Sequence, residues 1–455
     1  MITDNIYKVK KVEKPHDIVT EVPGSKSITN RALLLAALAK GKSILKGVLF
    51  SDDSRHFMQA LKDLGFPVEI DEEHKTVTVE GFGGAIPCEN TSNWMNRQEK
   101  HGRKPTNSST NEDIHIDGAI YVGSAGTAAR FLTAFLGLSK GRYRINASEQ
   151  MKKRPMKELL TALEEIGSEI IYEEEPYHFP FIIGNFSCKK NYTLIDVEKS
   201  SQFLSALLIN SVLLPENFAI RVSGTHGMTY VDMTIKMMKQ FGVSIAVHNN
   251  NSYHKVTENT YQAREYRIEP DVSAACYFYG LSPLLKVNVK VKNVHMNCLQ
   301  GDIKFLKVLV RMGCAIIEEP DGVVMIPPNA FLAGGSFDLS SFSDQALTLA
   351  AIAPFAASKV CIMNVGHIRY QECDRIHAIL DNLMRMGVSA IFQADNIFIL
   401  PGKPTACTIE TYEDHRVAMA FSMPGVVTEG IKIKNPSCTR KTFENYFETL
   451  EEALY

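Results

Sequence analysis

The alternation of apolar and polar positions along the chain repeats one short pattern. An amphipathic helix ends in an apolar residue and a glycine, and a short apolar strand follows. The pattern occurs at least five times, as ALKDLGFPVEI, ALEEIGSEIIY, MMKQFGVSIAV, VLVRMGCAIIE and NLMRMGVSAIF. Each glycine stands where a helix needs a left-handed residue before the chain enters a strand. These glycines are Gly65, Gly167, Gly242, Gly313 and Gly387.

The spacing of these glycines predicts six similar helix and strand units in two groups of three. The last four glycines are almost evenly spaced, and a final helix at 442–454 lies where a sixth unit would close the series without its strand. The first interval is longer, and the excess coincides with 88–117, which is rich in Asn, Ser, Thr, Lys and Glu. Because the repeats continue on both sides, we expect 88–117 to be a surface insertion rather than a linker between domains.

Composition narrows the class of protein. A chain of 455 residues is long enough for two or three domains. Its formal net charge is −2, so it has no global basic field for a nucleic acid. The longest apolar stretch, 346–357, is broken by Thr348 and Pro354 and is too short to span a membrane. We therefore expect no nucleic-acid or membrane partner. The N-terminal residues are acidic and lack an apolar run, so we expect a cytoplasmic protein.

The nine cysteines are scattered singly, from Cys88 to Cys438, and form no C-x-x-C pair. This distribution argues against a disulfide framework or a zinc site. We expect the cysteines to be small buried apolar residues.

Positive charge at the starts of helices is the main chemical signal. A cation in the first turn is unfavourable because of the helix dipole, unless an anion lies there too. A single such site suggests a surface charge paired with its Asp neighbour, but five together predict a convergent pocket for small polyanionic substrates. The residues are Lys26 and Arg31, Arg130 after Gly123 and Gly126, Arg375 after Asp374, His415 and Arg416 after Asp414, and Arg440 with Lys441.

Other polar residues fit such a pocket. Ser27, Thr29 and Asn30 are N-cap candidates for the first helix, and Ser200, Ser201 and Gln202 offer uncharged donors before another. Asp344 precedes a nearly all-apolar helix, where capping is its favoured role and a general base the alternative. Phosphate-loop, dinucleotide, zinc-protease and Ser-His-Asp signatures are absent from the sequence.

Nine separated motifs together resemble the EPSP synthases, the 3-phosphoshikimate 1-carboxyvinyltransferases, over essentially the whole chain. They are PGSKSITNRALLLAAL, GSAGTAARFL, KRPMKELL, SSQFLSALL, GDIKF, SDQALTLA, ECDRI, TYEDHRVAMAF and CTRKTFENYF. The resemblance implies a two-domain inverted α/β barrel-like fold in which each domain has three βαβαββ units. One domain would span 25–269 and include the insertion, and the other would combine 1–24 with 270–455. The active site would lie in the cleft between them.

The resemblance also implies an activity. The family transfers the enolpyruvyl group of phosphoenolpyruvate to the 5-hydroxyl of shikimate 3-phosphate and releases phosphate, without a metal or an organic cofactor. We expect a monomer with these two small-molecule substrates. Asp344 would accept a proton, Glu372 would donate one, and Lys26 would lie between the substrates.

The family's substrate contacts carry over to matching positions of this chain. For shikimate 3-phosphate these are Lys26, Ser27, Arg31, Ser200, Ser201, Tyr230 and Asp344. For phosphoenolpyruvate they are Lys26, Gly126, Arg154, Gln202, Arg375, Arg416 and Lys441.

Four positions depart from the family pattern. Ser124 and His367 replace the usual Asn, Gly227 replaces a phosphate-binding Ser, and Gln371 replaces a Lys that contacts shikimate 3-phosphate. These departures concern the acceptor rather than phosphoenolpyruvate. An enolpyruvyl transferase for another anionic alcohol, such as a UDP-sugar, and a non-catalytic paralogue that binds metabolites therefore stay as alternatives.

Overall fold

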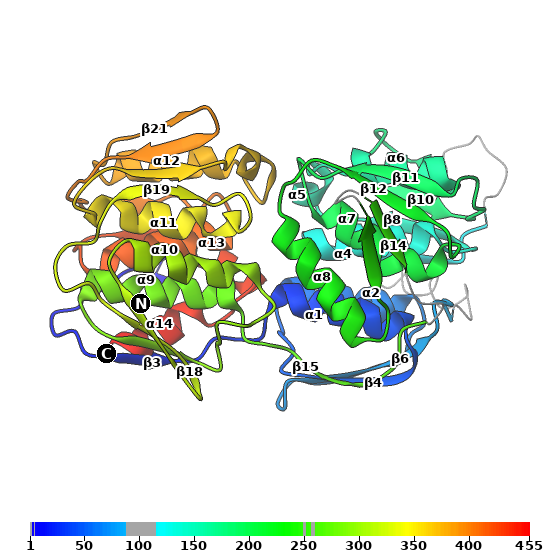
Figure 1. Cartoon of the computed structure of the whole chain (residues 1–455), viewed down its shortest axis with the longest axis horizontal. Coiled ribbons are helices and arrows are strands. Elements are labelled where there is room, and N and C mark those ends of the chain that lie inside the picture. The colour runs from blue at the N-terminus through cyan, green and yellow to red at the C-terminus, as the bar shows by residue number, and fades with distance from the viewer. Residues whose placement is uncertain (1, 4, 88–114, 249–251, 256–259) are drawn as a thin grey trace. The chain divides into compact units, whose positions relative to one another are not determined.

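The computed structural model describes residues 2–3, 5–87, 115–248, 252–255 and 260–455. Most of the expected insertion at 88–117 lies outside these residues. The chain forms two compact units. Unit 1 comprises Met1–Lys26, His226–Met233 and Ile268–Tyr455, and unit 2 comprises Ser27–Thr225 and Thr234–Arg267. Both ends of the chain belong to unit 1 (Figure 1).

The three sheets of unit 2 share one strand order. In each sheet the first pair of strands is parallel and the other pairs are antiparallel. The sheets are β15 (Glu265–Arg267), β4 (Lys40–Lys46), β6 (Thr76–Phe82) and β5 (Val68–Asp71); β7 (Gly118–Tyr121), β8 (Arg142–Asn146), β10 (Phe181–Gly184) and β9 (Glu169–Tyr172); and β11 (Tyr192–Asp196), β12 (Ala219–Ser223), β14 (Ser252–Lys255) and β13 (Ile245–His248).

Unit 1 repeats this arrangement, which confirms the predicted βαβαββ repeat. Its sheets are β3 (Ile18–Thr20), β16 (Val289–Lys292), β18 (Gly322–Ile326) and β17 (Ala315–Glu319); β19 (Gly335–Asp338), β20 (Val360–Met363), β22 (Asn396–Ile399) and β21 (Ala390–Gln393); and β23 (Thr408–Ile409), β24 (Lys432–Lys434), β2 (Ile6–Lys8) and β1 (Ile2–Thr3).

The sixth βαβαββ repeat is completed by strands from the N-terminal end of the chain. Strand β2 pairs antiparallel with β24, with Ile6 opposite Lys434 and Tyr7 opposite Ile433, and β1 adds to β2. The expectation that this unit lacks its strand is therefore wrong. The missing hairpin comes from the N-terminus, because strand pairing depends on proximity in space rather than in sequence.

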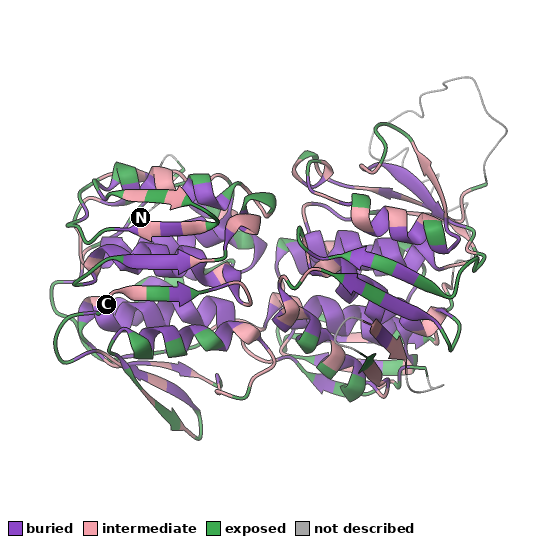
Figure 2. Cartoon of the chain, turned by 45° about the horizontal axis from the view of Figure 1, so that its top comes forward, coloured by how far each residue is buried: buried purple, intermediate pink, exposed green. Residues whose placement is uncertain are grey.

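Six helices, one from each of the six βαβαββ repeats, are buried over most of their length (Figure 2). Their sequences are apolar almost all round, as expected for helices with no solvent-facing side. In unit 1 they contribute to the hydrophobic core, in which Tyr277, Leu349 and Phe421 are at most 1% exposed. The buried helices are α1 (Lys26–Leu38), α4 (Gly126–Gly137), α7 (Gln202–Ile209), α9 (Val272–Leu285), α11 (Ala346–Ile352) and α13 (His415–Ser422).

The remaining long helices are amphipathic, and the repeated glycines follow five of them. The glycines after α2, α6, α8, α10 and α12 all have positive φ, from 74° to 122°, which confirms the predicted left-handed helix ends. These helices are α2 (Asp52–Asp63), α6 (Lys157–Ile166), α8 (Met228–Gln240), α10 (Lys304–Arg311), α12 (Arg375–Arg385) and α14 (Tyr446–Leu454), and α5 (Glu149–Lys152) is a single turn.

Short 3-10 helices join several elements. The last helix is shorter than the predicted 442–454, because η7 ends at Lys441, Thr442 follows with a φ of −142°, and α14 starts only at Tyr446. The 3-10 helices are η1 (Asn210–Leu213), η2 (Gly301–Ile303), η3 (Ser343–Gln345), η4 (Ala353–Phe355), η5 (Gly366–Tyr370), η6 (Met423–Val426) and η7 (Pro436–Lys441).

The cysteines are less uniformly buried than expected. Cys276, Cys314 and Cys361 are buried, whereas Cys188 is exposed and the others in the described residues are half-buried. All of the described cysteines are free thiols. None of the described helices is both long and apolar enough to cross a membrane.

Candidate active site

In unit 1, the carboxylate of Asp344 bridges two arginines. Its Oδ1 accepts a hydrogen bond from Arg375 Nη1, and its Oδ2 forms an ion pair with Arg416 Nη2, each at 2.9 Å. The N-cap residue of α11 is Gln345, and no side chain caps that helix. The favoured prediction that Asp344 caps the apolar helix is therefore wrong, because the two guanidinium groups take up its oxygens. Asp344 stands in η3, one residue before Gln345, the N-cap position of α11.

The charges around Asp344 shift the pKa values of two neighbouring carboxyl groups, Asp344 and Asp302, in opposite directions. Burial would raise the pKa of Asp344, but Arg416, Arg375 and Lys26 outweigh it and lower that pKa to about 2. Burial and the Asp344 charge raise the pKa of Asp302 to about 6. One oxygen of Asp302 accepts from Gln345 Nε2 at 2.8 Å, and the other has no hydrogen-bond partner in the described structure. Asp344 is thus ionised at neutral pH beside a second carboxyl that titrates near pH 6.

Arg375 is held by the N-cap residue of the next helix rather than by its sequence neighbour. Its Nε donates to Asp414 Oδ2 at 2.7 Å, and Asp414 Oδ1 accepts from the backbone N of Arg416 at 2.8 Å. Asp374 instead caps α12 and pairs with Arg369. Arg375 is only 2% exposed, so the alternative of a solvated surface pair does not hold. Asp344 and Asp414 are the anions that offset these two positively charged helix starts.

The turn before α13 is conformationally strained. Tyr412 and Glu413 have φ of 53° and 56°, and consecutive non-glycine residues in this region cost free energy that the surrounding packing must supply. The turn delivers Asp414 to the N-cap position, where it is fully buried. The strain is therefore associated with the placement of the carboxylate that binds Arg375.

A second ion pair, between Glu372 Oε2 and Lys441 Nζ, lies in the same unit and is almost buried, with the two side chains 9% and 8% exposed. His415 and Lys26 lie close to this group, because both Lys26 and Glu372 influence the titration of His415. Burial, with Lys26 and Arg416, holds the pKa of His415 well below its usual range, so its ring is neutral.

Two of the positions that depart from the family pattern, Gln371 and His367, lie near Arg375. Gln371 Oε1 accepts a hydrogen bond from Arg375 Nη1. His367 Nε2 is 2.8 Å from Ser343 Oγ, and its ring contacts that of His226. Gly227, with φ of 62°, follows His226 at the start of α8. Tyr230, one turn further along α8, has its pKa raised by burial and then by Asp302 and Asp344.

In unit 2, two guanidinium groups converge on Gly126, the first residue of α4. A Cβ at Gly126 would lie 2.7 Å from Arg130 Nη1 and 2.7 Å from Arg154 Nη1. Arg130 also donates to Gln202 Oε1 at 3.3 Å, which ties the start of α4 to the start of α7. Arg154 Nη1 donates to the carbonyl of Ser124 at 3.5 Å. A side chain at this position would displace the arginine tips, which occupy its space.

The start of α1 packs against the same two helices. Arg31 is 2% exposed and donates to Thr234 Oγ1 at 2.8 Å and to Ser205 Oγ at 3.5 Å. Thr29 and Asn30 lie inside α1, where Thr29 accepts from Leu49 N and Asn30 donates to Thr127 Oγ1. Their predicted role as N-caps is therefore wrong, since α1 already begins at Lys26.

The described structure gathers the sequence-predicted residues in two groups. Ser200 Oγ accepts from the backbone N of Gln202 at 3.3 Å, and Ser201 is the buried N-cap residue of α7, although its side chain makes no capping hydrogen bond. Unit 1 holds Lys26, Tyr230, Asp344, Glu372, Arg375, Arg416 and Lys441, and unit 2 holds Ser27, Arg31, Gly126, Arg154, Ser200, Ser201 and Gln202.

Sequence reasoning assigned no role to Asp302 and treated Asp414 only as a neighbour of His415 and Arg416. The GDIKF motif contains Asp302 but gives no sign that its carboxyl faces Asp344. The N-cap role of Asp414 could have been inferred more easily, because Asp is a favoured N-cap residue and Asp414 comes directly before a helix start. Its pairing with Arg375 could not be read from a separation of 39 residues.

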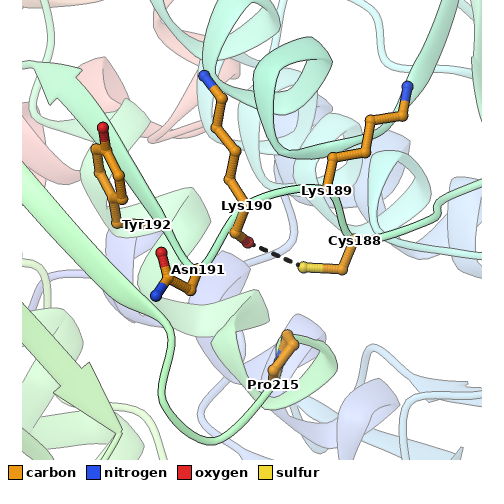
Figure 3. Close-up of a pocket in the computed structure, with 6 residues that line it drawn as sticks. All are labelled: Cys188, Lys189, Lys190, Asn191, Tyr192 and Pro215. Carbon is orange, nitrogen blue, oxygen red and sulfur yellow. Dashed lines mark hydrogen bonds between the residues drawn. The ribbon is translucent and has the colours of Figure 1, made fainter.

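A cavity of about 570 Å³ lies elsewhere on unit 2 (Figure 3). Cys188 Sγ donates to the Lys190 carbonyl at its edge. None of the predicted site residues lines it. The lining consists of Cys188, Lys189, Lys190, Asn191, Tyr192 and Pro215.

Comparisons with known proteins point to one family. The family described as EPSP synthase (3-phosphoshikimate 1-carboxyvinyltransferase) matches residues 9–97 and 90–450. A 3-phosphoshikimate 1-carboxyvinyltransferase of Nostoc sp. is 40% identical over 437 residues, which cover 96% of each chain. The 3-phosphoshikimate 1-carboxyvinyltransferase 2 of Halalkalibacterium halodurans is 35% identical over 435 residues, which cover 95% of this chain and 90% of the relative.

A solved structure of EPSP synthase from Acinetobacter baumannii superposes with a TM-score of 0.78, at 23% identity and with 98% of each chain covered. At this identity the likeness bears on the fold alone. It confirms the expected two-domain inverted α/β fold.

Proposed function

The chain belongs to the EPSP synthase family, and we propose that Asp344 and Glu372 are the groups that move protons in its reaction. The reaction transfers the carboxyvinyl group of phosphoenolpyruvate to the 5-hydroxyl of shikimate 3-phosphate, in the shikimate pathway of aromatic amino-acid biosynthesis. The protein is therefore a transferase. Its products are 5-enolpyruvylshikimate 3-phosphate and phosphate.

The bridging of Asp344 by Arg375 and Arg416 is the observation that carries the proposal. In the ligand-free chain the two arginines hold the carboxylate ionised, with a pKa of about 2. An anionic substrate that bound these guanidinium groups would weaken their hold and raise that pKa, which makes the carboxylate a stronger base. Asp344 would then accept the proton of the acceptor's hydroxyl as its oxygen attacks C2 of phosphoenolpyruvate.

The Glu372–Lys441 pair supports the complementary role. An ammonium partner favours the ionised carboxylate. If the phosphate of phosphoenolpyruvate binds the ammonium of Lys441, Glu372 loses its cationic partner and its pKa rises. It can then hold a proton and transfer it to the methylene carbon. The tetrahedral intermediate then loses phosphate, to which the proton held by Asp344 passes, and Glu372 takes a proton back from the new methyl group to restore the double bond.

The remaining residues of the proposed site bind the substrates. Lys26, Gly126, Arg154, Gln202, Arg375, Arg416 and Lys441 are proposed for phosphoenolpyruvate, and Lys26, Ser27, Arg31, Ser200, Ser201, Tyr230 and Asp344 for shikimate 3-phosphate. Guanidinium and ammonium groups suit carboxylates and phosphates, and hydroxyls add neutral donors. The chain is further proposed to be a cytoplasmic monomer, and light scattering after gel filtration tests its oligomeric state.

Release of phosphate from phosphoenolpyruvate tests the function. We expect release that requires shikimate 3-phosphate and produces one phosphate per enolpyruvyl product. Release that requires a UDP-sugar instead would establish a different acceptor. Binding of both metabolites without any release would identify a non-catalytic paralogue, and either result would overturn the proposal.

A further inference from the structure

Two imidazole rings meet in unit 1 beside the bridged carboxylate. The rings of His226 and His367 have centroids 3.3 Å apart and planes inclined by 42°. His226 precedes Gly227 at the start of α8, and His367 lies in η5, so the contact joins two distant parts of the chain. Both residues are half-buried, which leaves the pair accessible to a ligand.

The surroundings of the pair are cationic as well as anionic. His367 Nε2 is 2.8 Å from Ser343 Oγ. Burial and then His226 lower the pKa of His367 to about 3, and Arg375 lowers it further against the opposing effect of Asp344. Asp395 is the carboxylate beside Gly366, at the start of η5. In the ligand-free chain the His367 ring is therefore neutral.

An added proton on this pair would need an anion nearby. Two contacting imidazoles repel each other when both are charged, and Arg375 is close enough to oppose charging of His367. An anionic ligand would reverse this balance, because an opposite charge within a few ångströms favours the protonated imidazole. The adjacent Gln371 supplies no cation, and its amide oxygen is already bound by Arg375.

We propose that His226 and His367 form a proton-binding pair that recognises the phosphate of the acceptor alcohol. The inference rests on the proposed function and specifies how this chain holds its acceptor. The pair would take up a proton from solvent when the phosphate binds. This proton would supply the positive charge that Gln371, in place of a Lys, does not provide. The affinity for the acceptor then falls as pH rises, because the proton is lost above the pKa of the pair in the complex.

Titration calorimetry of the full chain with shikimate 3-phosphate tests the proposal. Between pH 7 and 8.5 the phosphate itself is mostly a dianion, so proton uptake in this range reports on the protein. For the wild type we expect uptake of protons, measured in two buffers of different ionisation enthalpy. We also expect Kd to rise roughly threefold or more per pH unit.

His367→Asn and His226→Asn should each abolish most of the uptake and flatten the pH dependence of Kd. At pH 7 we expect each to weaken binding by roughly tenfold, the loss of one charge-assisted contact. His254→Asn is the matched control. His254 also pairs with a second imidazole, His248, and its Nε2 is 2.9 Å from Ser252 Oγ, but it belongs to unit 2, whereas Asp344 belongs to unit 1.

The possible outcomes separate the two claims. Unchanged proton uptake in both Asn variants, with normal phosphate release by the wild type, would overturn the histidine pair and leave the proposed function intact. A wild type that neither binds shikimate 3-phosphate nor releases phosphate would overturn both. A variant that does not fold, as judged by its melting curve, leaves the other variant to decide.

Discussion

Arg375 donates from its Nε to Asp414 at 2.7 Å, so the first residue of α12 is tied to the residue that caps α13. The same arginine reaches Asp344 at 2.9 Å. One buried guanidinium therefore links the start of one helix to the turns before two others, and a change in any of its partners should be felt at the proposed site.

Replacement of Asp414 should be costly. Asn at this position can still cap α13, but Asp414→Asn removes the negative partner of a buried arginine, which typically destabilises a protein by about 3–5 kcal/mol. The exposed pair of Asp374 with Arg369 predicts a loss below about 1 kcal/mol for Asp374→Asn. Urea unfolding of the two variants measures the difference, and equal losses would show that Asp414 acts only as a cap.

Asp344→Asn and Glu372→Gln should each lower kcat by about 10²–10⁴-fold, because each removes a group proposed to move a proton. Phosphoenolpyruvate should bind Asp344→Asn at least as tightly as the wild type, since two arginines lose a competing carboxylate. Steady-state kinetics and calorimetry measure both effects. Asp338→Asn and Glu413→Gln, at exposed positions of the same unit, are controls that should keep wild-type rates; a kcat within about tenfold of wild type in both test variants would remove the assignment.

Gly126→Ala should raise the KM for phosphoenolpyruvate more than it lowers stability. The added Cβ meets the tips of Arg130 and Arg154 at 2.7 Å, and flexible tips can move without disturbing the core. The displaced guanidinium groups would no longer converge on one point. Gly402→Ala, whose Cβ would make only an ordinary 3.5 Å contact with Val388, is the control. An unchanged KM would show that Gly126 serves only the packing of α4.

Asp302→Asn should stabilise the chain at neutral pH. The folded-state pKa of Asp302 is raised to about 6, so the folded state binds a proton that the unfolded state has already released. Stability therefore falls as pH rises from about 4 to about 6, by on the order of 1–3 kcal/mol. In the Asn variant this loss should disappear, as measured by melting temperatures from pH 4.5 to 7.5. A variant that melts below the wild type at pH 7.5 would contradict the prediction.

Gln371→Lys should tighten shikimate 3-phosphate by roughly tenfold to a hundredfold, because an ammonium adds a charge-assisted contact. Arg375 loses one acceptor but keeps Asp344 and Asp414. In the double variant with His367→Asn, binding should also become independent of pH between 7 and 8.5. Calorimetry at low salt measures both effects, and a weaker Kd in the single variant would mean that the added cation repels Arg375 more than it attracts the ligand.

Much of the architecture could be predicted from local patterns. Gly65, Gly167 and the three later glycines mark helix ends, because a residue without a side chain adopts the left-handed conformation most easily. This preference depends only on the neighbouring residues, so it can be predicted from the sequence. Apolar periodicity likewise predicted the amphipathic helices that precede these glycines. The positively charged helix starts marked candidate site residues, since a cation in the first turn opposes the helix dipole wherever the helix lies.

Partners could not be predicted in the same way. Asp344 was expected to cap a helix, and it binds Arg375 and Arg416 instead. Pairing of Arg375 with its neighbour Asp374 was the alternative to a convergent pocket, and the partner of Arg375 is Asp414. In each case a short-range interaction competes with an ion pair between residues far apart in sequence, and only the packing of α11, α12 and α13 decides which one forms.

The sequence by itself determined the repeating unit, the number of repeats and the types of residue that gather at helix starts, because these follow from backbone conformation and from interactions within one turn. The tertiary structure decided which strands complete each sheet, as when Ile6 pairs opposite Lys434, and which imidazoles, carboxylates and guanidinium groups touch. Such contacts depend on how distant segments pack, and their energies change with burial and with neighbouring charge, which no local pattern records.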